Sequence, residues 1–218
     1  MPATTARRPR KRRPLPDSTT HPLLLKGLMD LQRISIKFYL HDDGEAISPE
    51  EAFRIFTSWI PTTADEVLVD VADYSHIAKA QQTLLVGHDA NYCVDTTDGR
   101  KGLLYSRKRP VVGTTAERLR DAFATALRAC GRLERDAGSE GVRFKGEEAL
   151  LTVNDRLNAP NDEETLAAIA PELDSVLQKL FGGAETEVER NGDARQLFSL
   201  RLRARGEFDI DALIENLS

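Results

Sequence analysis

The sequence predicts an α+β protein with a mixed, largely antiparallel sheet or sheets built from hairpins, and with helices packed on one face. Three observations support this. Short runs rich in β-branched and aromatic residues are separated by turn signals. Two stretches open with helix-capping residues. Strands and helices also follow one another irregularly, whereas a regular strand–helix alternation would favour a parallel sheet.

The first half of the chain is predicted to hold five strands and two helices. The strands are ISIKFYL (34–40), EVLVDVA (66–72), TLLVGH (83–88) and a hairpin over residues 91–109. Ser48, with Pro49 after it, marks the start of one helix. Thr114 and Glu117 form a capping box at the start of a second helix, which runs to about residue 136.

The second half is predicted to repeat a plan of hairpin followed by helix. VRFKGEEALLTV (142–153) reads as a hairpin that turns at Lys145-Gly146, and the next helix starts after Asn161, with Pro171 as a potential break. A hairpin around Asn191-Gly192 and a short helix, DIDALIENL, complete the chain. We therefore expect a disordered basic leader (1–20), an α+β lobe (21–138) and a C-terminal lobe (139–218), or one continuous domain spanning both lobes.

The net charge of −5 hides a strong asymmetry. Without the six basic residues of the leader, 24 basic residues remain against 35 acidic ones, so the rest of the chain carries −11. An acidic body is a poor surface for nucleic acid, and only the leader is a weak candidate for phosphate binding. Its basic residues are Arg7, Arg8, Arg10, Lys11, Arg12 and Arg13.

The composition points to a cytoplasmic protein with no inserted membrane segment. No apolar run reaches the roughly 18 residues of a membrane helix, and no apolar segment of signal-peptide length follows the basic leader. Cys93 and Cys130 are too few for a disulfide framework.

The most informative stretch is DVADYSHIAKAQQTLLVGHDANYCVD, which places titratable groups beside strands that must be buried. Asp70 interrupts an apolar strand, so it should be paired, protonated or beside a water-filled pocket, unless the strand lies at a sheet edge. If the second and third strands are neighbours, their loops could bring Asp73, His76, His88 and Asp89 together, a grouping that suits acid–base work. No metal site is predicted, because no HExxH, HxH or CxxC spacing occurs.

A basic pair on the returning strand completes the candidate site. In LLYSRKR, Arg107 and Lys108 point to opposite faces, and a guanidinium or ammonium group at a strand end suits a carboxylate or phosphate ligand. The candidate ligand-binding residues are Asp70, Asp73, His76, His88, Asn91, Arg107 and Lys108. The loop NDRLNAPN (154–161) is also polar, but turn and capping interactions explain most of it.

Three hypotheses of function remain open. The first is a binding or accessory module whose polar pocket holds a small anionic ligand or a partner segment. The second is an enzyme of unknown reaction in which His88 or His76 is paired with Asp70 or Asp73. The third is a structural or oligomeric body tethered to nucleic acid by the leader. No P-loop, GxGxxG or GxSxG motif supports a nucleotide-dependent or classical hydrolase activity, and the sequence identifies no cofactor.

The motifs LLVGHDANYCVD, GLLYSRKR and NDRLNAPN together resemble an uncharacterised family of bacterial proteins of about this size. The resemblance spans roughly residues 32–205 and leaves out the leader. It implies a bacterial, cytoplasmic protein, and it implies no catalytic residues, cofactor or partner.

Overall fold

The computed structural model describes residues 29–41, 47–77, 81–138 and 141–218. They form eight strands and four helices. The strands are β1 (Ile34–Leu40), β2 (Leu68–Asp73), β3 (Gln81–Gly87), β4 (Ala90–Asp95), β5 (Gly102–Arg107), β6 (Phe144–Val153), β7 (Thr186–Arg190) and β8 (Phe198–Ala204). The helices are α1 (Pro49–Trp59), α2 (Thr115–Asp136), α3 (Glu163–Leu180) and α4 (Ile210–Leu217).

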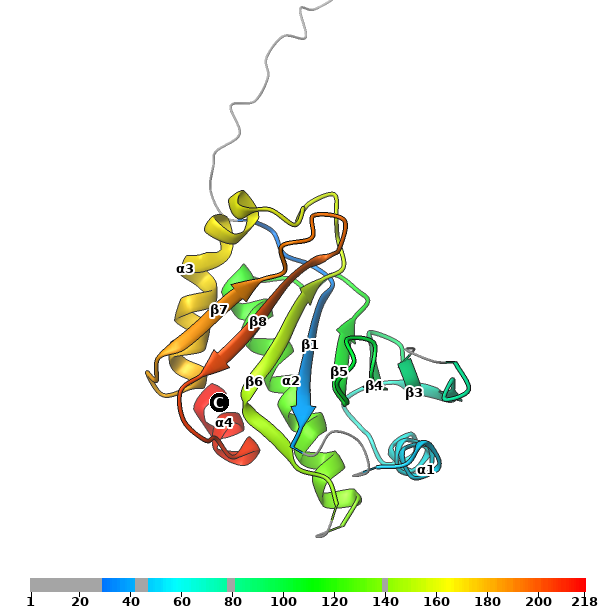
Figure 1. The fold of residues 1–218 in the computed structure, drawn as a ribbon. Coiled ribbons are helices and arrows are strands. Elements are labelled where there is room, and N and C mark those ends of the chain that lie inside the picture. The colour runs from blue at the N-terminus through cyan, green and yellow to red at the C-terminus, as the bar shows by residue number, and fades with distance from the viewer. Residues whose placement is uncertain (1–28, 42–46, 78–80, 139–140) are drawn as a thin grey trace, which may run out of the picture.

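All eight strands belong to one twisted antiparallel sheet, in the order β2-β3-β4-β5-β1-β6-β8-β7 (Figure 1). The predicted α+β class with a largely antiparallel sheet is confirmed. β1 pairs with β5 on one side and with β6 on the other, so residues of both predicted lobes share one sheet.

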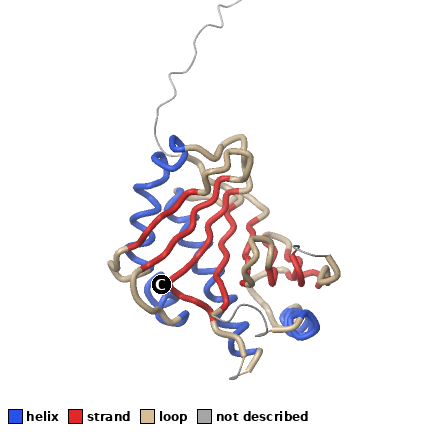
Figure 2. The backbone as a smooth tube through the Cα atoms, in the orientation of Figure 1, coloured by secondary structure: helices blue, strands red, loops and turns tan. Residues whose placement is uncertain are grey.

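The helices gather on one face of the sheet (Figure 2). α2 packs on β1 and β5, α3 and α4 pack against α2, and α1 covers β2 and β3. The face without helices is called the open face below. Figure 1 views the part of it formed by β1, β6, β8 and β7.

Side-chain alternation explains which residues face the helices. In β1, Ile36 and Phe38 lie on the helix side, where the Phe38 ring meets that of Phe123 in α2 at 6.5 Å between centroids. Lys37 and Tyr39 therefore point to the open face. Ile36 pairs with Tyr105, which in turn pairs with Tyr92, and paired residues point to the same face. Tyr105 and Tyr92 therefore also lie beneath the helices.

The helix starts follow the capping signals of the sequence. The Ser48 side chain accepts a hydrogen bond from the Glu51 backbone, and Thr114 and Glu117 form the predicted capping box. The third helix differs slightly, because the Asp162 side chain, rather than Asn161, caps α3.

Two local predictions were wrong. Residues 144–153 form the single strand β6 without a turn at Lys145-Gly146, and α3 runs through Pro171 without dividing. The glycine in β6 serves a close approach instead, because a Cβ atom on Gly146 would lie 2.1 Å from the Phe208 carbonyl oxygen. Among the described residues, no helix is long and apolar enough to cross a membrane.

Candidate functional site

A cavity of about 270 Å³ lies between α2 and the end of the sheet formed by β2, β4 and β5. Its floor is apolar and aromatic, and its rim carries charges of both signs. The aromatic, acidic and basic residues that line it include Trp59, Glu66, Tyr92, Tyr105, Arg107, Arg128 and Arg132.

Three arginines form the cationic side of the cavity. Arg128 and Arg132 stand one turn apart on α2, so they project along the same side of the helix. Arg107 reaches the cavity from the end of β5 and pairs with Asp121 of α2. Guanidinium groups from two elements therefore converge on one space.

The three arginines differ in how far their charges are neutralised. Arg132 stacks on the Trp59 ring at 4.5 Å from its centroid, donates to Thr63 Oγ1 at 2.8 Å and lies 3.6 Å from the Asp136 carboxylate. Arg128 donates to Thr125 Oγ1 at 3.1 Å and forms no ion pair with any described residue. Arg128 thus has donors available to a ligand.

Glu66 supplies a carboxylate on the sheet side of the cavity. Its Oε2 accepts a hydrogen bond of 2.6 Å from the Tyr92 hydroxyl. Burial raises the pKa of Glu66 above its ordinary value, and the hydrogen bond from Tyr92 only partly opposes that effect. No described cationic group lies within ion-pair distance of this carboxylate.

The floor of the cavity contains two packed tyrosine rings. Tyr92 and Tyr105 lie opposite each other on β4 and β5, with their ring centroids 5.5 Å apart. Burial, first of all, raises the pKa of both hydroxyl groups far above the ordinary value. Both side chains therefore stay neutral, and because they are almost wholly buried they close the floor of the cavity rather than project into it.

Some of the residues singled out in the sequence meet near this cavity. His88 and Asp89 form the turn between β3 and β4, with His88 Nδ1 3.0 Å from Asp89 Oδ1. The Lys108 ammonium group donates to the carbonyl oxygen of Gly87 in the same turn. Asp89 and Arg107 line the cavity, whereas His88 and Lys108 lie beside it.

The other predicted site residues lie elsewhere, so the seven residues do not form one pocket. β2 is an edge strand, and Asp70 is exposed there, bonded to the Val71 backbone. Asn91 and Asp70 both flank Val86 on the open face, opposite in direction to Arg107. The buried Asn91 Oδ1 has no hydrogen-bond partner among the described residues.

The prediction that Asp73, His76 and His88 lie close together was wrong, and the register of β2 with β3 explains why. Asp73 pairs with Thr83 at one end of the β2–β3 hairpin, and Leu68 pairs with Gly87 at the other. His76 follows the first end and His88 follows the second, so the antiparallel pairing separates them by the length of the hairpin. Asp73 instead accepts a hydrogen bond from the Ser75 backbone, which is the main cause of its lowered pKa.

Sequence reasoning missed a buried ionic network on the open face. Lys37, whose side chain is 1% exposed, bonds Asp95 at 2.7 Å and also donates to Asp98 and to the Arg100 carbonyl oxygen. The Tyr39 hydroxyl donates to the Asp98 carboxylate at 2.7 Å. The network fixes the β4–β5 turn onto β1, and the one signal for it was a lysine in the middle of the apolar strand ISIKFYL.

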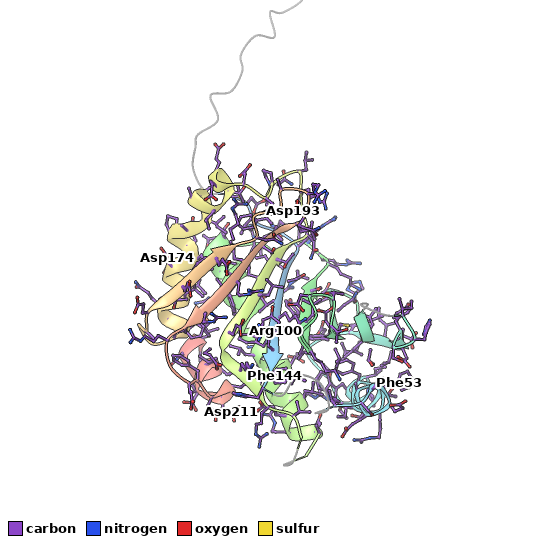
Figure 3. The ribbon with its side chains drawn as sticks, in the orientation of Figure 1. Phe53, Arg100, Phe144, Asp174, Asp193 and Asp211 are labelled. Atoms are coloured by element: carbon purple, nitrogen blue, oxygen red, sulfur yellow. The ribbon has the colours of Figure 1, made fainter. Side chains whose placement is uncertain are left out.

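Glu148 of β6 extends this network. Its carboxylate receives two hydrogen bonds from Arg100, at 2.6 and 2.8 Å, and lies 3.5 Å from Arg203. Figure 3 shows Arg100 over the middle of the sheet, where its guanidinium group stacks on the Tyr39 ring at 3.8 Å. The hydrogen bonds from Arg100, above all, lower the pKa of Glu148 despite its burial.

The lowered pKa of Glu148 predicts an acid-sensitive contribution to stability. Ionised Glu148 stabilises the fold fully above its ordinary pKa of 4.5, and this contribution is lost as the pH falls through the lower folded-state pKa. The difference in unfolding free energy between wild type and Glu148→Gln should therefore be largest near neutral pH and shrink towards about pH 3. Urea titrations at several pH values measure it, with Glu147→Gln as control. A difference that does not change with pH would contradict this account.

A larger cavity, of about 710 Å³, lies where α2 ends and α4 begins. Several of its polar groups already stabilise the fold. Glu134 accepts a hydrogen bond from the Phe144 backbone, Asp209 caps α4, and Arg135 lies 3.7 Å from Asp211. We take the smaller cavity as the better candidate site, because three arginines converge there beside aromatic residues.

The remaining sequence candidates are structural or lie outside the described residues. In NDRLNAPN, Asn161 donates to the carbonyl oxygens of Asn191 and Asp193 and so holds two loops together. The leader arginines and Lys11 fall in the part of the chain that is not described. Within the described ranges, no three His, Cys, Asp or Glu side chains gather in a way that could hold a metal ion.

Comparisons with known proteins gave no match from which a function could be inferred, so the function is inferred from the candidate site. No protein-family model matches the chain, and the search of curated proteins found no match.

Proposed function

We propose that this protein is a cytoplasmic binding module that holds a small organic anion in the cavity between α2 and the β4–β5 strands. The observation that carries this proposal is the convergence of Arg107, Arg128 and Arg132 on one cavity with an aromatic floor. Arg128 has no carboxylate partner among the described residues, so its charge is available to a ligand. A carboxylate bound by guanidinium groups gains short, charge-assisted hydrogen bonds.

The size and lining of the cavity limit the ligand to a small molecule. Pockets for drug-sized ligands usually measure about 300–1,000 Å³, so a cavity of about 270 Å³ suits a metabolite of amino-acid size. Trp59, Tyr92 and Tyr105, which are 2%, 6% and 1% exposed, form a nearly closed floor that offers a ligand an uncharged surface of small area. The ligand is therefore expected to carry both an anionic group and an apolar group.

An enzyme is the alternative, and one observation favours it. His88 and Asp89 form the contact expected of an acid–base group and its orienting carboxylate. However, both side chains are about half exposed, at 48% and 49%, and His88 does not line the cavity. Binding therefore fits the geometry better than catalysis does.

Replacing Arg128 with glutamine is expected to weaken binding of a carboxylate ligand about tenfold or more. A hydrogen bond to a charged group contributes about 1.5–3 kcal/mol, and about 1.4 kcal/mol corresponds to a factor of ten. Isothermal titration calorimetry would use 3-phenylpropionate, 4-methylpentanoate and the amino acids with the same skeletons, phenylalanine and leucine.

The matched control is Arg120→Gln, which removes the same charge from an exposed position of α2 that does not line the cavity. This control should bind like wild type. If none of the four carboxylates binds, or if Arg128→Gln and Arg120→Gln bind equally, the proposal is wrong.

A further inference from the structure

The same cavity holds an unmatched negative charge as well as an unmatched positive one. The Glu66 carboxylate is half-buried and bonded to the Tyr92 hydroxyl, and no described cationic group lies within ion-pair distance of it. Arg128 lacks a carboxylate partner in the same way. These two groups line one space without neutralising each other.

The other charges around the cavity are largely matched within the protein. Arg107 pairs with Asp121 and Arg132 lies near Asp136. Asp89 has His88 at 3.0 Å and Arg109 at 3.8 Å. Glu66, Asp65 and Arg128 line the cavity without an ion pair to any described residue, and of these Asp65 and Arg128 are exposed whereas Glu66 is half-buried. Glu66 is therefore the acidic group that gains most from a cation on a ligand, and Arg128 is the arginine whose donors remain available.

An ionised, half-buried carboxylate without a neighbouring cation destabilises the folded protein, because burial removes water that would otherwise stabilise its charge. Burial accordingly raises the pKa of Glu66. A ligand ammonium group beside Glu66 would favour the ionised carboxylate, while the Tyr92 hydroxyl keeps that carboxylate in place. A carboxylate on the same ligand would then be available to Arg128, which lines the same cavity.

We propose that the ligand is a zwitterion of the α-amino-acid type with an apolar side chain. Its ammonium group contacts Glu66, its carboxylate contacts Arg128, and its side chain lies against the aromatic floor. This inference rests on the proposed anion-binding function and specifies the class of ligand for the same cavity.

The decisive experiment compares ligands that share a skeleton but differ in charge. Calorimetry on the full chain would measure L-phenylalanine, 3-phenylpropionate, which lacks the ammonium group, and phenylalaninamide, which lacks the carboxylate. The leucine set, with 4-methylpentanoate and leucinamide, repeats the test without an aromatic ring. The zwitterion of at least one set is expected to bind about tenfold more tightly than either analogue, as loss of one charged contact implies.

The Glu66→Gln variant tests the role of the carboxylate while retaining an acceptor for the Tyr92 hydroxyl. It should lose about tenfold in affinity for the amino acid and keep or improve its affinity for 3-phenylpropionate. Retained binding of the acid also shows that the variant is folded. Glu50→Gln, the same chemical change at an exposed residue of α1 that does not line the cavity, should leave the preference for the zwitterion intact.

The outcomes separate the two proposals. If the simple acids bind as tightly as the amino acids, or if Glu66→Gln preserves the preference, the zwitterion inference is wrong and the anion-binding proposal stands. If no carboxylate of either set binds, both proposals fail.

Discussion

Replacing Lys37 with methionine is expected to lower the free energy of unfolding by about 3–5 kcal/mol. The change removes the cation from a site where its side chain is 1% exposed and that of Asp95 is 2% exposed. Asp95 would keep its hydrogen bond from Thr97 Oγ1, but its charge would be buried without the ammonium group. Asp98 would lose the same partner.

Urea unfolding of the single variants and the double variant measures this effect. Lys37→Met combined with Asp95→Asn removes both charges, so it should be less destabilised than the sum of the two single changes. A loss below about 1 kcal/mol in Lys37→Met would show that the lysine is no more important than a surface ion pair.

Replacing Phe123 with alanine is expected to lower the free energy of unfolding by about 3–5 kcal/mol as well. Phe123 is fully buried in α2 and packs edge-on against Phe38 of β1. Its loss would leave a cavity between the helix that carries Arg128 and the centre of the sheet. The cost combines lost burial with incomplete collapse around the missing ring.

The matched control is Phe53→Ala, because Phe53 lies on α1 and is 41% exposed. The same chemical deletion there should cost far less, since a surface change away from special contacts usually alters stability by about 0.5 kcal/mol or less. Thermal unfolding of both variants gives the comparison. Equal losses would contradict the assignment of Phe123 to the core.

Local signals in the sequence were sufficient to predict the class of fold. The capping residues Ser48 and Thr114 marked helix starts correctly. The glycine of Lys145-Gly146 was misread as a turn, because a glycine can equally serve a close approach. Here the approaching group is Phe208, more than sixty residues later in the chain, which local pattern cannot reveal.

The candidate site was predictable only in part, because it depends on which segments meet. Arg107 was identified as an anion-binding candidate, but Arg128 and Arg132, which line the same cavity, were not singled out. Nothing local distinguishes them from Arg120, which lies on the same helix away from the cavity. His76 and His88 were grouped on loop proximity, and the register of β2 with β3 separates them.

The position of β1 has a consequence for the order in which the chain can fold. β1 is made first, yet one of its two neighbours, β6, begins only at Phe144. Until β6 emerges from the ribosome, the strand ISIKFYL has at least one open hydrogen-bonding edge and an apolar face beside it. Completion of the sheet centre must therefore wait for the second half of the chain, and until then the free edge of β1 is a place where another strand could pair.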